Sequence, residues 1–131
     1  MKQVSRFGSL VVLPALALCP ATASADYFTR TAKSGVTSRM FTYHAHGEDC
    51  RAAGGIIKVV TKPEHGKLVP SREMSTIKGA RNRSTCIGAT IPGFRVDYTS
   101  APGYRGDDNF AIEYTFGSGG VVLDRFTVHV E

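Results

Sequence analysis

The sequence predicts an all-β protein, an antiparallel β-sandwich of about seven or eight strands with one disulfide. Short runs of residues alternate between apolar and polar side chains, which is the period of a strand with one buried face. Turn-forming residues separate these runs about every eight to twelve positions, and helical periodicity is almost absent. Two cysteines remain once an export leader is set aside, and a cysteine pair suits a small exported sandwich.

Residues 1–25 have the composition of an export signal and are excluded from the fold. Lys2 and Arg6 form a positive start, and residues 10–18 form an apolar run. Residues 23–25 (Ala-Ser-Ala) are a small-residue cleavage site. The apolar run is too short to span a membrane. We therefore expect an exported protein, periplasmic or extracellular, with one domain at 26–131.

Cys19 raises an alternative, because a lipoprotein anchor also follows an apolar leader. Leu18 stands before this cysteine, where a lipoprotein signal needs a small residue, and Pro20 follows it. The better small-residue site at 23–25 favours cleavage after residue 25.

The size and charge of the mature chain indicate how many domains it forms and which partners are unsupported. Removing 25 of the 131 residues leaves 106, which is the size of one domain. Loss of Lys2 and Arg6 lowers the formal charge from +5 to +3. This mild charge gives little support for a nucleic-acid partner. No later segment approaches the roughly 20 apolar residues of a transmembrane segment.

The predicted strands follow the apolar alternation along the chain. Pro63 and Pro70 are expected to end strands, because proline cannot donate to a ladder. Residues 71–83 are predicted as a loop with a short strand or turn, and residues 117–120 as a hairpin turn. We expect an edge strand that begins at Tyr27-Phe28. The further strands are expected at 37–46, 56–62, 67–69, 85–91, 94–98, 110–116 and 121–130.

One polar residue interrupts an apolar face on the last predicted strand. Asp124 shares its face with Val122, Phe126 and Val128, because alternate residues of a strand point the same way.

The connection at residues 99–109 has the length and composition of a corner between two sheets. Its eleven residues exceed an ordinary hairpin loop, so we expect it to arch from one sheet to the other. Tyr104 is its one large apolar group and is predicted to fold back over the end of the core.

The segment 94–116 resembles the C-terminal signature of bacterial Ig-like and cadherin-like tandem-repeat domains. There, a strand with a terminal aromatic residue leads into a Pro-Gly-aromatic-x-Gly-x-Asp-x-Phe corner. The matching residues are Tyr98, Pro102, Gly103, Tyr104, Gly106, Asp108 and Phe110. Residues 63–68 (PEHGKL) resemble a second segment of those domains, Pro-x-His/Asn-Gly-x-Leu.

The resemblance covers roughly half of the mature chain and implies an Ig-like β-sandwich. It also implies a structural or binding role in the cell envelope. The module would contact a protein or polysaccharide through its loops or an edge strand. Fold analogy does not identify the ligand.

Cys50 and Cys86 are predicted to form a disulfide, because an even cysteine count in an exported protein favours pairing. In the chain-entropy model, this bridge stabilises the fold by about 4 kcal/mol. No C-x-x-C spacing supports a redox role. Cys50 lies in a Gly-rich segment, so we expect the bridge to join a loop to a strand. The absence of Trp excludes an antibody-type domain with its core Trp.

The His44-x-His46 pair is the one constellation with metal-ligand character. Residues two apart on a strand share a face, so both imidazoles can reach one Zn or Cu ion. His65 and Asp49 are the candidate further ligands, and a small periplasmic metal-binding protein is the alternative function. The other interpretation places both histidines on the solvated face of a strand end. A bare His-x-His lacks the ligand count of a metal site, which favours that interpretation.

The acidic residues at 107–108, with Asn109, allow a calcium interpretation, because hard oxygen ligands suit that ion. The loop offers few oxygens, so we expect Asp108 to cap the corner through backbone N–H groups instead.

The basic residues Arg72, Lys78, Arg81 and Arg83, with Arg95 beyond them, form a candidate binding surface. Such a surface can contact an anionic envelope polymer or a membrane surface. Aromatic residues are not interleaved with these charges, which argues against nucleic acid. A solvated loop without a partner is the simpler interpretation. Loops on a rigid sandwich nevertheless commonly carry binding.

No pattern in the sequence indicates an enzyme or a bound cofactor. The chain has no G-x-S-x-G motif, and the disulfide would leave no cysteine nucleophile. No carboxylate pair has a distinctive context. We therefore predict a protein without catalytic activity.

Overall fold

The computed structural model describes residues 24–78 and 85–131. Arg81 and Arg83 of the predicted basic surface lie outside the described residues, as does the predicted leader apart from its last two positions.

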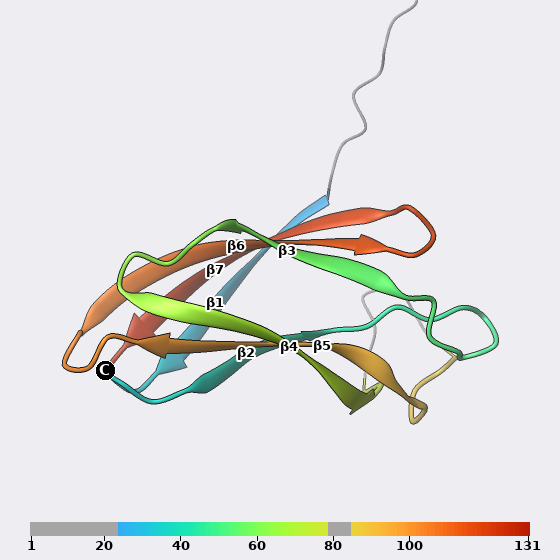
Figure 1. The fold of residues 1–131 in the computed structure, drawn as a ribbon, viewed down its shortest axis with the longest axis horizontal. Coiled ribbons are helices and arrows are strands. Elements are labelled where there is room, and N and C mark those ends of the chain that lie inside the picture. Colours follow the sequence, from blue (N-terminus) through green and yellow to red (C-terminus); the bar gives the residue numbers. More distant parts are fainter. Residues whose placement is uncertain (1–23, 79–84) are drawn as a thin grey trace, which may run out of the picture.

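In the described part of the chain, seven strands form two sheets and no helix occurs (Figure 1). One sheet has four strands in the order β1-β7-β6-β3, and the other has three in the order β2-β5-β4. The predicted all-β class is therefore confirmed. The strands are β1 (Ser24–Ala32), β2 (Ser38–Tyr43), β3 (Gly55–Thr61), β4 (Gly66–Thr76), β5 (Thr90–Ser100), β6 (Gly106–Phe116) and β7 (Val121–Val130).

The first strand corrects the prediction of a purely antiparallel fold. β1 pairs with β7 in parallel, from Ser24 opposite Val122 to Ala32 opposite Val130. The chain leaves β1 for a strand of the other sheet, so no hairpin forces β1 and β7 to run in opposite directions. Arg30 Nε donates to the carbonyl of Met40 at 3.0 Å and so joins β1 to β2. The predicted edge strand around Tyr27-Phe28 is confirmed.

β4 is longer than predicted, because Pro70 does not end it. The strand pairs with β5 along its whole length, from Gly66 opposite Ser100 to Thr76 opposite Thr90. β4 is an edge strand, where a proline can turn its missing donor away from the ladder. The loop predicted from residue 71 is therefore strand as far as Thr76.

β5 replaces the two strands predicted at 85–91 and 94–98. Residues 85–88 form a turn, and the strand begins at Thr90. Pro92 is tolerated because β2 pairs with β5 only from Phe94 onward, which leaves Pro92 with one neighbouring strand. A side chain at Gly93 would approach the Tyr43 carbonyl, so glycine lets the end of β2 pass close by.

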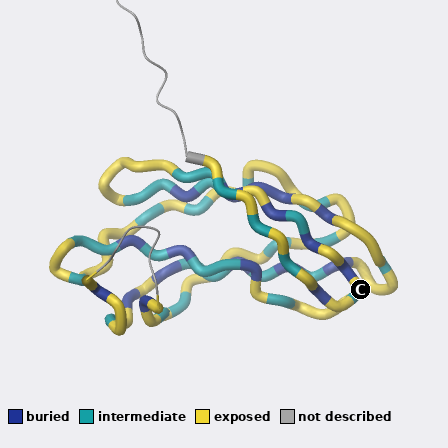
Figure 2. The backbone as a smooth tube through the Cα atoms, turned by 180° about the vertical axis from the view of Figure 1, so that it is seen from behind, coloured by how far each residue is buried: buried dark blue, intermediate teal, exposed yellow. Residues whose placement is uncertain are grey.

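The core lies between the two sheets and is rich in aromatic rings. Buried segments alternate with exposed ones along the strands (Figure 2). Phe110 and Phe126 stack with ring centroids 4.6 Å apart, and Tyr43 stacks on Tyr114 at 5.2 Å. The buried members of this core are Ala32, Met40, Tyr43, Ala45, Val96, Tyr98, Phe110, Ile112, Tyr114, Phe126, Val128 and Val130.

Two buried carboxylates each join one sheet to the other. Tyr43 on β2 donates its hydroxyl to Asp124 on β7 at 2.7 Å. Tyr98 on β5 donates to Asp108 on β6 at 2.9 Å. Both carboxylates are at most 2% exposed, so these hydrogen bonds lie where water does not compete strongly.

The predicted corner connects β5 to β6 and so passes from one sheet to the other. It is shorter than predicted, because the strands extend to Ser100 and from Gly106. Tyr104 packs against the core cluster, stacks on His65 at 4.1 Å and donates its hydroxyl to the carbonyl of Asp107.

Asp108 accepts hydrogen bonds from backbone N–H groups, as expected, but two of its three amide donors belong to the turn between β3 and β4 and not to the corner. Its carboxylate accepts from the amides of Glu64 at 2.9 Å, His65 at 3.0 Å and Asn109 at 3.0 Å. With the Tyr98 hydroxyl, these donors occupy both oxygens. The neighbouring Asp107 carboxylate pairs with His129.

The disulfide between Cys50 and Cys86 is confirmed and spans a sequence separation of 36 residues. Cys86 lies in the turn at 85–88, so the bridge joins two loops and not a loop and a strand. A second small core forms around it, in which Ile77 is fully buried and Ile91 is 4% exposed.

Candidate functional site

The candidate site is on the outer face of the three-stranded sheet, where polar side chains from all three strands meet. Thr42 of β2 lies opposite Arg95 of β5, and Arg39 lies opposite Asp97. Glu73 of β4 reaches the same face. Inner positions of β5, such as Val96 and Tyr98, are fully buried, so the alternation of the strand turns Arg95 and Asp97 outward.

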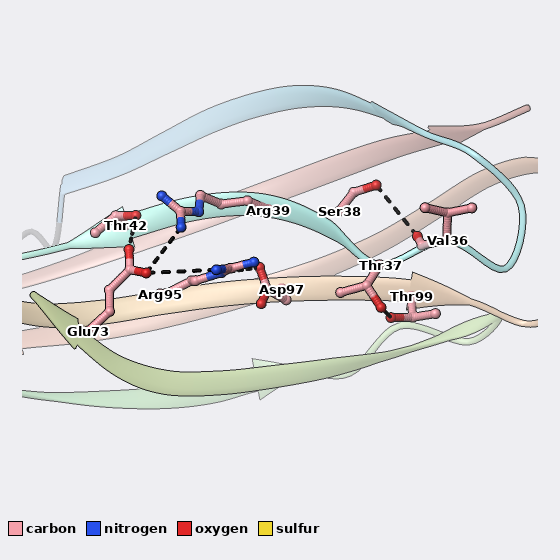
Figure 3. A network of polar contacts seen from close by, with 9 residues as sticks. All are labelled: Val36, Thr37, Ser38, Arg39, Thr42, Glu73, Arg95, Asp97 and Thr99. Atoms are coloured by element: carbon pink, nitrogen blue, oxygen red, sulfur yellow. Dashed lines mark hydrogen bonds and ion pairs between the residues drawn. The ribbon is translucent and has the colours of Figure 1, made fainter. Parts of the chain in front are cut away.

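These side chains form a connected network of ion pairs and hydrogen bonds (Figure 3). Arg39 Nη2 lies 3.0 Å from Glu73 Oε2, and Arg95 Nη1 lies 3.8 Å from the same oxygen. Arg95 Nε also lies 2.7 Å from Asp97 Oδ1. Thr42 donates to Glu73 Oε1 at 3.4 Å. The hydrogen bond to Asp97 raises the pKa of Arg95, against a smaller effect of desolvation.

An open groove of about 440 Å³ lies beside this network, between the end of β2 and the end of β4. Lys78, which the sequence predicted as a binding residue, lines it together with His44, which was predicted as a metal ligand. Serine and threonine hydroxyls supply much of the remaining surface, and Met74 adds one exposed apolar side chain. Its main polar lining residues are Arg39, Thr42, His44, Glu73, Ser75 and Lys78.

His44 is partly buried at the wall of this groove. Its Nδ1 atom is buried and makes no hydrogen bond within residues 24–78 and 85–131. Burial lowers the pKa of His44 below its ordinary value of 6.5, and the charge of His46 lowers it further. The neutral imidazole therefore predominates at pH 7.

The residues of the predicted metal site do not come together. β2 ends at Tyr43, so His44 and His46 follow the strand and do not lie on it as predicted. His65 lies in the turn between β3 and β4, beside the far end of β5, where it stacks on Tyr104. Asp49 accepts a hydrogen bond from the amide of Arg51. Among the residues that the structure describes, no group of three His, Cys, Asp or Glu side chains can hold a metal ion.

The predicted basic surface is divided by β4. Lys78 faces the groove, whereas the Arg72 guanidinium lies over the Phe94 ring, 5.2 Å from its centroid. Phe94 packs against the core cluster, so Arg72 belongs to the side of β4 that faces the inside of the sandwich. Arg95 joins the ion-pair network described above.

Sequence reasoning missed Arg39, Thr42 and Glu73. Arg39 and Glu73 are 34 positions apart in the chain and belong to strands that do not pair with each other. Only β5, lying between β2 and β4, brings them to one face. The sequence offered one indication of these residues. Arg39 and Thr42 are polar residues within the predicted strand 37–46, and Glu73 is a polar residue a few positions after the predicted strand 67–69.

The buried position of His44 predicts a pH-dependent stability. Because its folded-state pKa lies below 6.5, protonation favours the unfolded chain. The contribution of His44 to stability is therefore present above pH 6.5 and is lost as the pH falls toward the folded-state pKa. Denaturant unfolding of the wild type and of His44→Gln at about pH 7.5 and pH 5.5 measures it. The wild type should lose more stability than the variant, and parallel losses would contradict the assignment.

No family model matches the sequence, and no curated protein matches it. Among solved structures, the chain is similar to one titled "Solution Structure of Amebosin". The two share 13% sequence identity over 85% of this chain and 100% of that chain, with a TM-score of 0.44. Within residues 24–78 and 85–131, no helix is long and apolar enough to cross a membrane.

Proposed function

We propose that this protein is an exported, non-enzymatic Ig-like module that binds an acidic polysaccharide of the cell envelope. The groove beside β2 and β4 is the binding site. The Ig-like assignment is supported by the order of strands in the two sheets and by the Tyr98–Asp108 corner. The signal-like composition of residues 1–25 supports export.

The main support for the proposal is that positively charged side chains outnumber acidic ones among the lining residues of the groove. Glu73 is the acidic side chain among the lining residues, and it already contacts two arginines. Lys78 adds a further positive charge, and Arg39 keeps half of its side-chain surface exposed. The groove therefore favours an anionic ligand.

The polar groups and the open shape of the groove suit a sugar polymer. Hydroxyl groups of Thr42, Ser75 and Thr76 can exchange hydrogen bonds with sugar hydroxyls. Arginine and lysine bind carboxylates through charge-assisted hydrogen bonds. A groove open to solvent admits a chain that continues beyond both ends, whereas small-molecule sites enclose most of their ligand.

The segment that follows β4 extends the basic character in sequence. Arg81 and Arg83 follow Lys78 by three and five positions. Their part in binding stays a prediction from the sequence.

Substitution of Lys78 by glutamate tests this function. We expect calorimetric titration of residues 26–131 with polygalacturonate to show binding that weakens as salt rises. Lys78→Glu should weaken it by about tenfold or more, because one charge-assisted contact is replaced by repulsion. Lys67→Glu is the matched control, since Lys67 is exposed near the start of β4, whereas Lys78 follows the end of that strand.

Three results would contradict the proposal. One is that polygalacturonate fails to bind at low salt, and another is that a neutral polysaccharide of similar length binds equally well. Equal losses in Lys78→Glu and Lys67→Glu would show that net charge, and not the groove, controls the affinity.

A further inference from the structure

A second, smaller pocket opens on the other side of β4, at the mouth between the two sheets. Its volume is about 120 Å³. β3 and β4 are edge strands of different sheets, and each pairs with a neighbour on one side alone. The pocket lies beside both of them, next to the glycine-rich segment that precedes β3. Its principal lining residues are Gly54, Gly55, Arg72, Phe94 and Tyr114.

Arg72 brings an unneutralised positive charge to this pocket. Arg39, Arg51 and Arg95 each pair with a carboxylate. Within residues 24–78 and 85–131, Arg72 makes no ion pair, and its contact is with the face of the Phe94 ring. A contact between a guanidinium and a ring face uses the positive charge and leaves N–H donors available for an anion.

Tyr114 adds a hydrogen-bond donor to the same pocket. Tyr43, Tyr98 and Tyr104 each donate their hydroxyl to an oxygen of the protein. The Tyr114 hydroxyl makes no hydrogen bond to any residue that the structure describes. Burial raises the pKa of Tyr114, so the hydroxyl keeps its proton at neutral pH and can donate it.

The backbone at Gly55 leaves room for this hydroxyl. A Cβ atom at position 55 would overlap the ring end of Tyr114, so a larger residue would push the hydroxyl out of its place. The ring is 2% exposed and is held by Tyr43, Phe94 and Phe116. The donor position of Tyr114 is therefore rigid.

The size of the pocket limits what can enter it. At about 120 Å³, the pocket is smaller than a site for a complete small molecule. Sites for complete small molecules are about 300 Å³ or larger. The pocket therefore accepts one functional group that projects from a larger ligand.

We propose that this pocket binds a single carboxylate group of a uronic acid residue, held by the Arg72 guanidinium and the Tyr114 hydroxyl. The inference deepens the proposed function and rests on it. Arg72 supplies charge-assisted hydrogen bonds and Tyr114 a third donor to the same anion. β4 lies between the groove and the pocket. An acidic polysaccharide that crosses the edge of this strand can therefore contact Lys78 with one sugar unit and Arg72 with another.

Titration with the monomer glucuronate separates this pocket from the groove. In ¹⁵N-labelled residues 26–131, we expect saturable shifts of the Gly54 and Gly55 amide signals. The neutral methyl ester of glucuronate should cause none of them, because it lacks the anion. Arg72→Gln should weaken glucuronate binding about tenfold or more. Tyr114→Phe, which removes only the hydroxyl, should weaken it about fivefold.

Arg125→Gln is the matched control for Arg72→Gln, since Arg125 is exposed on the four-stranded sheet. This variant should bind glucuronate as the wild type does. The inference is overturned if the glycine amides do not shift, if the methyl ester binds equally well, or if Arg72→Gln and Arg125→Gln behave alike. Loss of polymer binding in Lys78→Glu tests the groove separately. Failure of the pocket and failure of the proposed function are therefore distinguishable.

Discussion

Replacing Asp108 by alanine is expected to lower the free energy of unfolding by about 4 kcal/mol. Asp108 is 2% exposed and accepts hydrogen bonds from the Tyr98 hydroxyl and from three backbone amides. The substitution leaves these donors without their acceptor at the junction of both sheets. Each lost hydrogen bond to a charged group is worth about 1.5–3 kcal/mol, and the losses are not additive. Denaturant unfolding measures the difference.

The neighbouring carboxylate provides the control for this experiment. Asp107 is exposed and pairs with His129, so Asp107→Ala should cost about 1 kcal/mol or less. Tyr98→Phe removes a single donor from Asp108 and should cost an intermediate amount, about 1–2 kcal/mol. Equal costs for Asp108→Ala and Asp107→Ala would contradict a structural role of the buried carboxylate.

Removal of the disulfide by Cys50→Ala with Cys86→Ala should have an effect of similar size. A bridge that spans a sequence separation of 36 residues lowers the entropy of the unfolded chain. In the chain-entropy model its loss reduces the free energy of unfolding by about 4 kcal/mol. Cys86 also packs with Ile77 and Ile91, so some buried contact is lost as well. Urea unfolding of the variant beside the oxidised wild type measures the difference.

The reduced wild type is the control for the disulfide variant. It keeps the cysteine side chains and their packing, so its loss of stability isolates the effect of the covalent bridge. We expect most of the change to appear in the reduced protein. If reduction costs less than about 1 kcal/mol, chain entropy does not explain the stabilising effect of the bridge.

The candidate site could be predicted only in part. Charge in the sequence selected Lys78 and Arg72, and both line pockets in the structure. Their separation could not be predicted, because it depends on how β4 lies against β5 and Phe94. The metal hypothesis treated His65 as a neighbour of His44. The fold places these residues beside opposite ends of β5, because the chain crosses between the sheets before it reaches His65.

By itself, the sequence determined the all-β class, the disulfide pair, the range of β7 and the carboxylate on the apolar face of that strand. These features depend on short-range alternation, on turn residues such as those at 117–120, and on cysteine count. Only the tertiary structure decided that Pro70 lies within a strand, that β1 runs parallel to β7, and that Tyr43 reaches Asp124. Whether a strand lies at an edge, and which side chain faces it from the other sheet, depends on pairing between distant segments. Local propensity does not contain that information.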